Sequence, residues 1–212
     1  MEGPKGSIEI TAAPDNFRRV VHLQVLTIAW MTIEVVVALG AAWVARSPAL
    51  LGFGGDSAVE LLSASIVFWR FRSRQDSVKT ERFAARVAGG LLFIVAGFVV
   101  VTSGLSLFGY REPRPSLVGI ILLILAATGM PQLARRKREL ASQMASAALK
   151  ADATESALCG YLSLIALAGL LASAIFHVPW ADPIAALALV PLIVREGWQA
   201  IRDSQHCCNS RV

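Results

Sequence analysis

Six long apolar segments, separated by short polar connectors, dominate this sequence. They run roughly over residues 20–45, 49–70, 84–108, 116–134, 144–176 and 181–201. A bilayer core about 30 Å thick needs about 20 mostly apolar residues when it is crossed by a helix. Each segment is long enough for that, so we predict an all-α integral membrane protein with a six-helix transmembrane bundle.

The composition agrees with a membrane protein and argues against a soluble or disordered one. Of the 212 residues, 55% are hydrophobic and 17% are charged, whereas a soluble domain carries about 25% charged residues. We expect a cytoplasmic tail over 1–18, a membrane domain over 19–201 and a short cytoplasmic tail over 202–212. The polar start of the chain gives no reason to expect a signal peptide. The basic residues lie in short clusters between apolar runs, so we expect no nucleic-acid partner.

Turn-forming residues separate the apolar segments. Arg46-Ser47-Pro48 lies between the first two, residues 109–115 lie between the third and fourth, and His177-Val178-Pro179-Trp180 lies between the fifth and sixth. Pro and Gly at such positions commonly mark the ends of helices. We expect Asp182 to cap the sixth helix, with Pro183 at its first helical position.

Lys and Arg are distributed unevenly between the two sets of connectors. The connectors after the second and fourth spans are strongly basic. These basic residues are Arg70, Arg72, Arg74, Lys79, Arg82, Arg86, Arg135, Arg136, Lys137 and Arg138, against Arg46, Arg111 and Arg114 on the other side. Lys and Arg accumulate in cytoplasmic loops. We therefore predict a multi-pass protein of a bacterial inner membrane with both termini in the cytoplasm.

Acidic residues inside apolar spans are the strongest functional signal. We single out five of them: Glu34, Asp56, Glu60, Asp152 and Glu155. An Asp at the bilayer centre costs about 2.5–3.5 kcal/mol on insertion scales, so such residues usually face the bundle interior and pair with something. Lys150 is the nearest basic residue, but positions i and i+2 of a helix do not face each other. We therefore expect the acids to lack a counter-ion within the chain and to bind protons, a cation, or each in turn.

The spacing of these acids predicts a shared site. Asp56 and Glu60 are four residues apart and project from one helix face. Asp152, Glu155 and Cys159 also share a face, at i, i+3 and i+7. Adjacent members lie about 6 Å apart along a helix, so antiparallel packing would let the two sets meet at one depth.

We therefore predict a four-ligand site for a divalent ion, formed by Asp56, Glu60, Glu155 and Cys159. Carboxylate and thiol donors at this spacing suit a divalent metal ion. Asp152 and Glu155 stay open as metal ligands or as a relay for protons and ions. Glu34 has no partner by spacing and is expected beside the site or along the permeation path.

Three motifs lie in an order found in a known family. They are Ser47-Pro48-Ala49-Leu50-Leu51 leading into Asp56-Ser-Ala-Val-Glu60, then Asp152-Ala-Thr-Glu155-Ser-Ala-Leu-Cys159 followed by Ser163, and finally Trp180-Ala181-Asp182-Pro183. Through them the chain, from about Trp30 to Arg202, resembles the cation diffusion facilitator (cation efflux) family. That family has a D-x-x-x-D pair of metal ligands in the second helix, roughly D-A-x-[H/D]-x-x-x-D in the fifth, and W-x-D-P at the start of the sixth.

The chain departs from the family pattern at the site itself. Glu60 and Cys159 stand where the family has Asp, and Glu155 stands where it has His or Asp. The family's soluble C-terminal domain has no counterpart in this sequence, so we interpret the chain as a short, divergent member. The resemblance favours zinc, while cobalt, nickel, manganese, iron and cadmium stay open because the donors mix carboxylate and thiol.

These observations predict proton-coupled efflux (antiport) of a zinc-like divalent cation across the lipid bilayer. Deprotonated carboxylates would bind the metal, and protonation would release it. The alternative is a membrane metal-binding or regulatory protein without a transport cycle. We do not expect an enzyme, because Asp56 and Glu60 lie too deep for chemistry on a lipid head group. We expect a homodimer, and Gly97 and Gly104 form either a seam between subunits or a packing surface inside the bundle.

Overall fold

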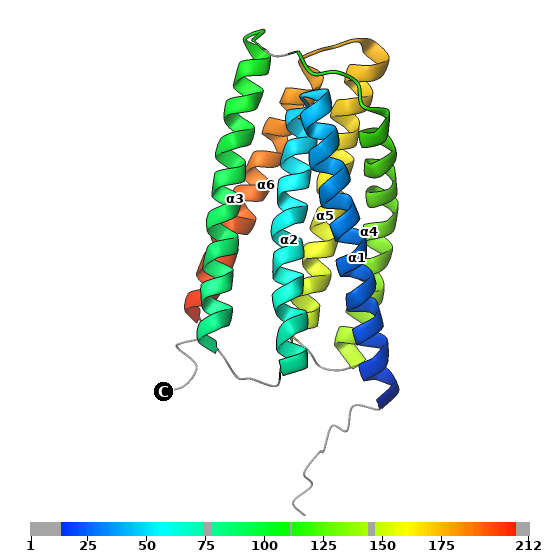
Figure 1. The fold of residues 1–212 in the computed structure, drawn as a ribbon, viewed down its shortest axis with the longest axis vertical. Coiled ribbons are helices and arrows are strands. Elements are labelled where there is room, and N and C mark those ends of the chain that lie inside the picture. The colour runs from blue at the N-terminus through cyan, green and yellow to red at the C-terminus, as the bar shows by residue number, and fades with distance from the viewer. Residues whose placement is uncertain (1–13, 74–77, 111, 144–146, 207–212) are drawn as a thin grey trace, which may run out of the picture.

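The structure is a computed structural model, and it describes residues 14–73, 78–110, 112–143 and 147–206. Within these ranges the chain forms six helices that run antiparallel along one axis (Figure 1). They are α1 (Pro14–Ala45), α2 (Pro48–Ser73), α3 (Val78–Leu107), α4 (Leu117–Gln143), α5 (Ala147–Phe176) and α6 (Ala181–His206). The six-helix bundle predicted from the sequence is confirmed.

The helix ends fall at the predicted breaks and use ordinary capping chemistry. Arg46 and His177 have positive φ angles, of 53° and 54°, directly after α1 and α5. Residues in this left-handed conformation commonly end helices. Ser47 then caps α2, because its Oγ accepts a hydrogen bond from the Leu50 N–H at 3.1 Å, and Pro48 occupies the first helical position.

α4 is longer than the sequence suggested. The fourth span was expected to end near residue 134 and to be followed by a basic loop, but the helix continues through Pro131 to Gln143. Arg135, Arg136, Lys137 and Arg138 therefore belong to α4 and not to a connector. The extension packs against α5, because Lys137 Nζ donates to Asp152 Oδ1 at 3.0 Å and to Ser156 Oγ at 2.8 Å.

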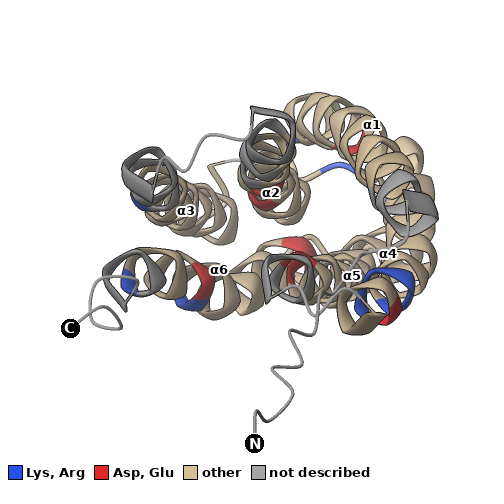
Figure 2. Cartoon of the chain, turned by 90° about the horizontal axis from the view of Figure 1, so that it is seen from below, with Lys and Arg blue, Asp and Glu red and all other residues tan. Residues whose placement is uncertain are grey.

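α2 occupies the centre of the bundle and packs against α1, α3, α5 and α6, while α4 packs against α1 and α5 (Figures 1 and 2). α3 and α6 form a close pair of their own. A Cβ atom added at Gly89 of α3 would lie 2.7 Å from the carbonyl oxygen of Gly197 in α6. Such an approach is possible only where both helices carry glycine.

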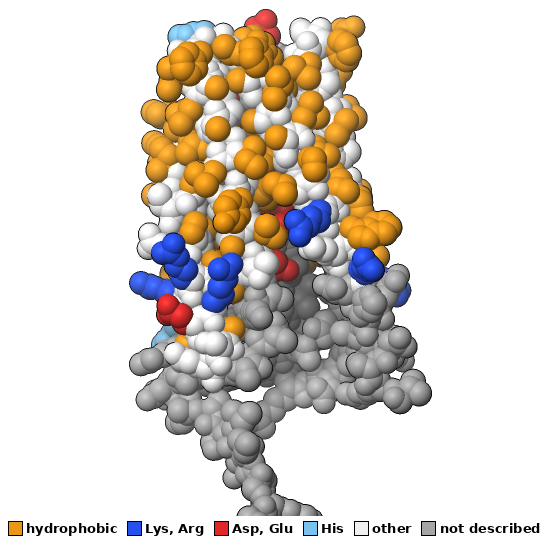
Figure 3. Space-filling view, turned by 180° about the vertical axis from the view of Figure 1, so that it is seen from behind, with side chains coloured by type: hydrophobic (Ala, Val, Ile, Leu, Met, Phe, Trp, Pro, Cys, Tyr) orange, Lys and Arg blue, Asp and Glu red, His pale blue; other side chains and the backbone are white. Residues whose placement is uncertain are grey.

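The outside of the bundle is apolar along most of its length. Figure 3 shows hydrophobic side chains over the upper part of one face and Lys and Arg side chains toward its lower end. By length and composition, five described helical segments could cross a membrane: Val21–Ala45, Arg86–Leu107, Leu117–Gln143, Asp152–Phe176 and Ala181–Arg202. α2 is not among these five; it carries Asp56 and Glu60 and lies at the centre of the bundle.

The two glycines proposed as a seam lie on the free side of α3. A Cβ atom added at Gly97 or Gly104 would meet nothing within 4 Å. Packing inside the described bundle therefore does not explain these glycines, whereas it does explain Gly89.

Candidate metal centre

The bundle encloses an acidic cavity of about 290 Å³ between α2, α3, α5 and α6. α2 contributes Asp56 and Glu60, and α5 contributes Glu155. Asp56 and Glu60 are both buried, and at 1.5 Å per residue they lie about 12 and 18 Å from the start of α2. Three of the predicted ligands therefore meet at one place near the middle of the bundle.

The rest of the cavity wall is apolar or neutral apart from one further acid. Besides the acids, the residues that the structure describes as lining it are Val59, Ala88, Leu92, Thr154, Leu158, Gln199 and Ala200, and none of the described lining residues is Lys or Arg. Thr154, Glu155 and Gln199 are exposed, so the cavity opens on their side. Figure 2 shows acidic positions on α2, α5 and α6 around one space at this end of the bundle.

Glu196 of α6 is the additional acid, and the spacing argument did not single it out. It lines the same cavity as Asp56, across the α2–α6 contact. Glu196 does fall inside the expected sixth span, beside Arg195. Two adjacent charged residues inside an apolar span are a sequence signal from which Glu196 could have been identified.

Asp152 does not reach this cavity, and it does have a counter-ion within the chain. Lys137 Nζ lies 3.0 Å from Asp152 Oδ1 and 3.0 Å from Oδ2, and it donates to Ser156 Oγ at 2.8 Å. Lys137 is 0% exposed. The expectation that no basic residue reaches the acids is therefore wrong, because the extra turns of α4 carry Lys137 into the bundle.

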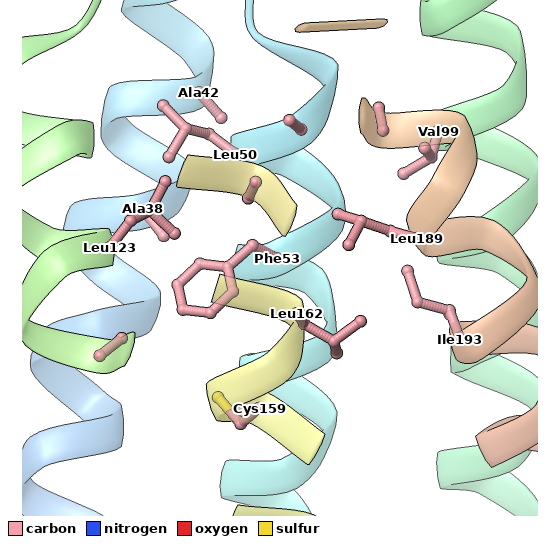
Figure 4. Packing of buried hydrophobic residues seen from close by; sticks show 14 of the residues in the cluster. Ala38, Ala42, Leu50, Phe53, Val99, Leu123, Cys159, Leu162, Leu189 and Ile193 are labelled. Atoms are coloured by element: carbon pink, nitrogen blue, oxygen red, sulfur yellow. The ribbon is translucent and has the colours of Figure 1, made fainter. Parts of the chain in front are cut away.

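Cys159 also lies away from the cavity lining. It belongs to the buried apolar cluster (Figure 4), and its Sγ lies 3.4 Å from Glu34 Oε1. The same Glu34 oxygen accepts a hydrogen bond from Ser57 Oγ at 2.8 Å. Glu34 on α1 therefore has partners on α5 and α2, although its spacing in the sequence suggested none.

The helical geometry of α5 explains why its acidic stripe is divided. At about 100° per residue, Glu155 and Asp152 point about 60° apart, and Cys159 points between them. A face this wide contacts more than one neighbour. Glu155 turns to the α2–α6 cavity, Asp152 turns to Lys137 of α4, and Cys159 turns to Glu34 of α1.

The cavity acids do not form a ready-made cage. In the described part of the chain, no three His, Cys, Asp or Glu side chains are grouped closely enough to hold a metal ion. A cation in the cavity would therefore be held by fewer protein ligands together with water, or would draw the helices closer.

Asp182 joins two helices at the opposite end of the bundle. Its Oδ1 accepts a hydrogen bond from Ser47 Oγ at 2.7 Å. The carboxylate expected to cap α6 thus contacts the N-terminus of α2, where the helix dipole favours negative charge. This hydrogen bond joins α2 and α6 at one end of the bundle. Toward the other end, the same two helices border the open cavity.

A helical bundle with an apolar exterior and carboxylates in a central cavity is typical of a multi-pass membrane protein that handles cations. The family described as "Cation efflux transmembrane domain" matches residues 25–205, and the chain belongs to this family. The family is one of transporters and not of enzymes.

Two curated relatives, both from Bacillus subtilis (strain 168), match the same length of chain. They are the manganese efflux system protein MneS and the uncharacterized transporter YdbO, and each is 25% identical over 128 residues. The matched segment is 60% of this chain but 44% of each relative. The match therefore spans less than half the length of these relatives.

Proposed function

We propose that this protein exports a divalent metal cation from the cytoplasm in exchange for protons. The observation that carries the proposal is the cavity in which Asp56, Glu60 and Glu155 meet without a lining Lys or Arg among the described residues. Carboxylates bind a metal ion only when deprotonated, so protons and metal compete for the same oxygen atoms. Membership of the cation efflux family and the similarity to MneS support metal transport.

The cavity favours a cation that prefers oxygen ligands. Cys159 faces Glu34 and does not line the cavity, and no His is among the described lining residues. Carboxylate and water ligands suit manganese, whereas thiolate and imidazole favour zinc. The manganese efflux named for MneS points the same way. We therefore propose Mn²⁺ as the first cation to test, in place of the zinc expected from the family resemblance.

A flux assay tests this proposal. The purified chain would be reconstituted in liposomes that hold a Mn²⁺-sensitive dye, and flux would be measured with and without an imposed pH gradient. We expect Mn²⁺ flux that accelerates with the gradient, exceeds Zn²⁺ flux, and falls at least tenfold in Asp56→Asn. Glu112→Gln is the matched control, because Glu112 is an exposed acid outside the helices. Flux that is unchanged in Asp56→Asn would contradict the proposal.

The same preparation separates transport from binding alone. A metal-binding or regulatory protein would show Mn²⁺ binding that depends on Asp56 but no flux above that of empty liposomes. This outcome would contradict metal export and favour the alternative, a membrane metal-binding or regulatory protein without a transport cycle.

We propose that the cavity opens toward the cytoplasm and that both termini lie there. Among the residues whose burial the structure describes, Arg gathers at that end of the bundle: Arg86, Arg135, Arg136, Arg138, Arg195 and Arg202, against Arg46 and Arg114 at the other end. A C-terminal fluorescent-protein fusion should be bright, and a C-terminal alkaline phosphatase fusion should be inactive. The reverse pattern would overturn this orientation.

We also propose a homodimer that packs through the free face of α3. Gly97→Leu should weaken the dimer measured by native mass spectrometry from mild detergent. Gly40→Leu is the control, because Gly40 on α1 also has open space around it. A monomeric wild-type protein would contradict the proposal.

A further inference from the structure

Glu196 is the fourth acid of the cavity and the one that α6 supplies. It lines the same cavity as Asp56, which is buried. Two ionised carboxylates that share one cavity repel each other. A cation held between the two groups would remove that repulsion.

A second feature of the cavity also points to a cation ligand. Glu60 lines the cavity and is 8% exposed, and its Oε1 atom has no hydrogen-bond partner in the described part of the chain. A buried acceptor without a partner is unfavourable, and more so when it is charged. The unpaired oxygen of Glu60 lies on α2 one turn from Asp56, on the same side as the Asp56–Glu196 pair.

Two described basic residues, Lys137 and Arg195, act electrostatically on acids of the cavity, but neither of them lines it. Lys137 is held by Asp152 and Ser156 on the α4 side of the bundle. Arg195 is adjacent to Glu196 in sequence but is exposed and does not line the cavity, and neighbouring residues on a helix point in different directions. The cavity of about 290 Å³ has room for an ion with several water molecules at about 30 Å³ each.

We propose that Glu196 of α6 and Asp56 of α2 together hold the transported divalent cation, with Glu60 as an additional oxygen donor. This inference rests on the proposed transport function and extends it by making α6 a ligand-bearing helix. An all-oxygen site of two or three carboxylates completed by water suits a hard cation such as Mn²⁺.

The position of Glu196 also gives the ion a structural role. α2 and α6 are already joined at the other end by Ser47 and Asp182. A cation between Asp56 and Glu196 fastens the same two helices at a second point and draws the α3–α6 pair toward α2. Binding is thereby coupled to closure of the cavity.

The test is Mn²⁺ binding to the purified full-length chain in detergent, measured from the electron paramagnetic resonance signal of free Mn²⁺. Glu196→Gln keeps the size of the side chain and removes its charge, so we expect Kd to rise at least tenfold, as in Asp56→Asn. Glu196→Asp keeps the carboxylate and should recover part of the affinity. Glu112→Gln makes the same change at an exposed acid outside the helices and away from the cavity, and its Kd should stay within twofold of the wild type.

Thermal unfolding provides a second readout that a structural role would not reproduce. Glu196→Gln should unfold at a higher temperature than the wild type without metal, because a like-charge contact is gone. It should also gain less than the wild type when Mn²⁺ is added, because the stabilisation by a bound ligand grows with the logarithm of its affinity. The double variant Asp56→Asn/Glu196→Gln should lose less affinity than the sum of the single variants, as expected for residues that share one ion.

Two results would overturn the inference, and they can be told apart. Wild-type affinity in Glu196→Gln together with lost affinity in Asp56→Asn would remove α6 from the site and leave the proposed function intact. If Mn²⁺ binds the wild type, Asp56→Asn and Glu196→Gln equally, or binds none of them, the proposed function fails and this inference fails with it.

Discussion

Lys137 Nζ lies 3.0 Å from both carboxylate oxygens of Asp152, and the lysine is completely buried between α4 and α5. This ion pair separates Asp152 from the acids of the cavity. It also places a positive charge inside the bundle. The pair is best understood as a structural connection between α4 and α5.

Removing one partner of this pair should destabilise the protein more than removing both. Lys137→Met leaves Asp152 buried and unpaired, which should lower the free energy of unfolding by about 3–5 kcal/mol. The double variant Lys137→Met/Asp152→Asn should recover most of that loss. Unfolding in mixed detergent micelles measures the difference. If Asp152→Asn instead abolishes Mn²⁺ binding in a folded protein, Asp152 is a metal ligand after all.

Cys159→Ser should leave metal binding almost unchanged. The thiol lies 3.4 Å from Glu34 and is 1% exposed inside an apolar cluster, away from the cavity lining. We expect the Kd for Mn²⁺ to stay within threefold of the wild-type value in a titration followed by electron paramagnetic resonance. A rise in Kd of more than tenfold would show that the thiol is a metal ligand, as its spacing in the sequence suggested.

Ser47→Ala should cost more stability than Ser116→Ala. Both serines cap a helix, since Ser47 Oγ accepts from Leu50 N–H and Ser116 Oγ accepts from Gly119 N–H, each at 3.1 Å. Loss of such a cap costs about 1 kcal/mol. Only Ser47 also donates to a buried carboxylate, that of Asp182, at 2.7 Å, which adds about 1.5–3 kcal/mol. Equal unfolding midpoints for the two variants would show that the α2–α6 contact contributes nothing.

Gly89→Ala should lower the stability of the protein, whereas Gly90→Ala should raise it. An added Cβ at position 89 would lie 2.7 Å from the Gly197 carbonyl oxygen and from the Ile201 side chain, whereas at position 90 it meets nothing within 4 Å. Overpacking of this kind costs about 1–3 kcal/mol. Ala instead of Gly in an open helical position gains up to about 1 kcal/mol. Thermal unfolding in detergent should therefore rank the Gly90 variant above the wild type and the Gly89 variant below it.

The helices and their breaks could be predicted almost completely from the sequence. Apolar runs of membrane-spanning length predict helices by themselves, because a backbone in lipid must satisfy its own hydrogen bonds. Ser47, Pro48 and His177 mark their ends through local chemistry that needs no tertiary contact. At one end of the bundle the helices run past their expected ends: α3 begins at Val78 and not near residue 84, and α4 continues to Gln143 and not to 134, where it packs against α5.

The candidate site could be predicted only in part. Sequence spacing determines which residues share a helix face, so Asp56, Glu60 and Glu155 were found. Spacing within one helix cannot say which neighbour a face meets. Only the tertiary packing decided that Asp152 pairs with Lys137, that Cys159 contacts Glu34, and that Glu196 of α6 lines the cavity. The physical reason is that a single α5 stripe is wide enough to contact α1, α4 and the α2–α6 cavity at once, and the arrangement of those helices divides it.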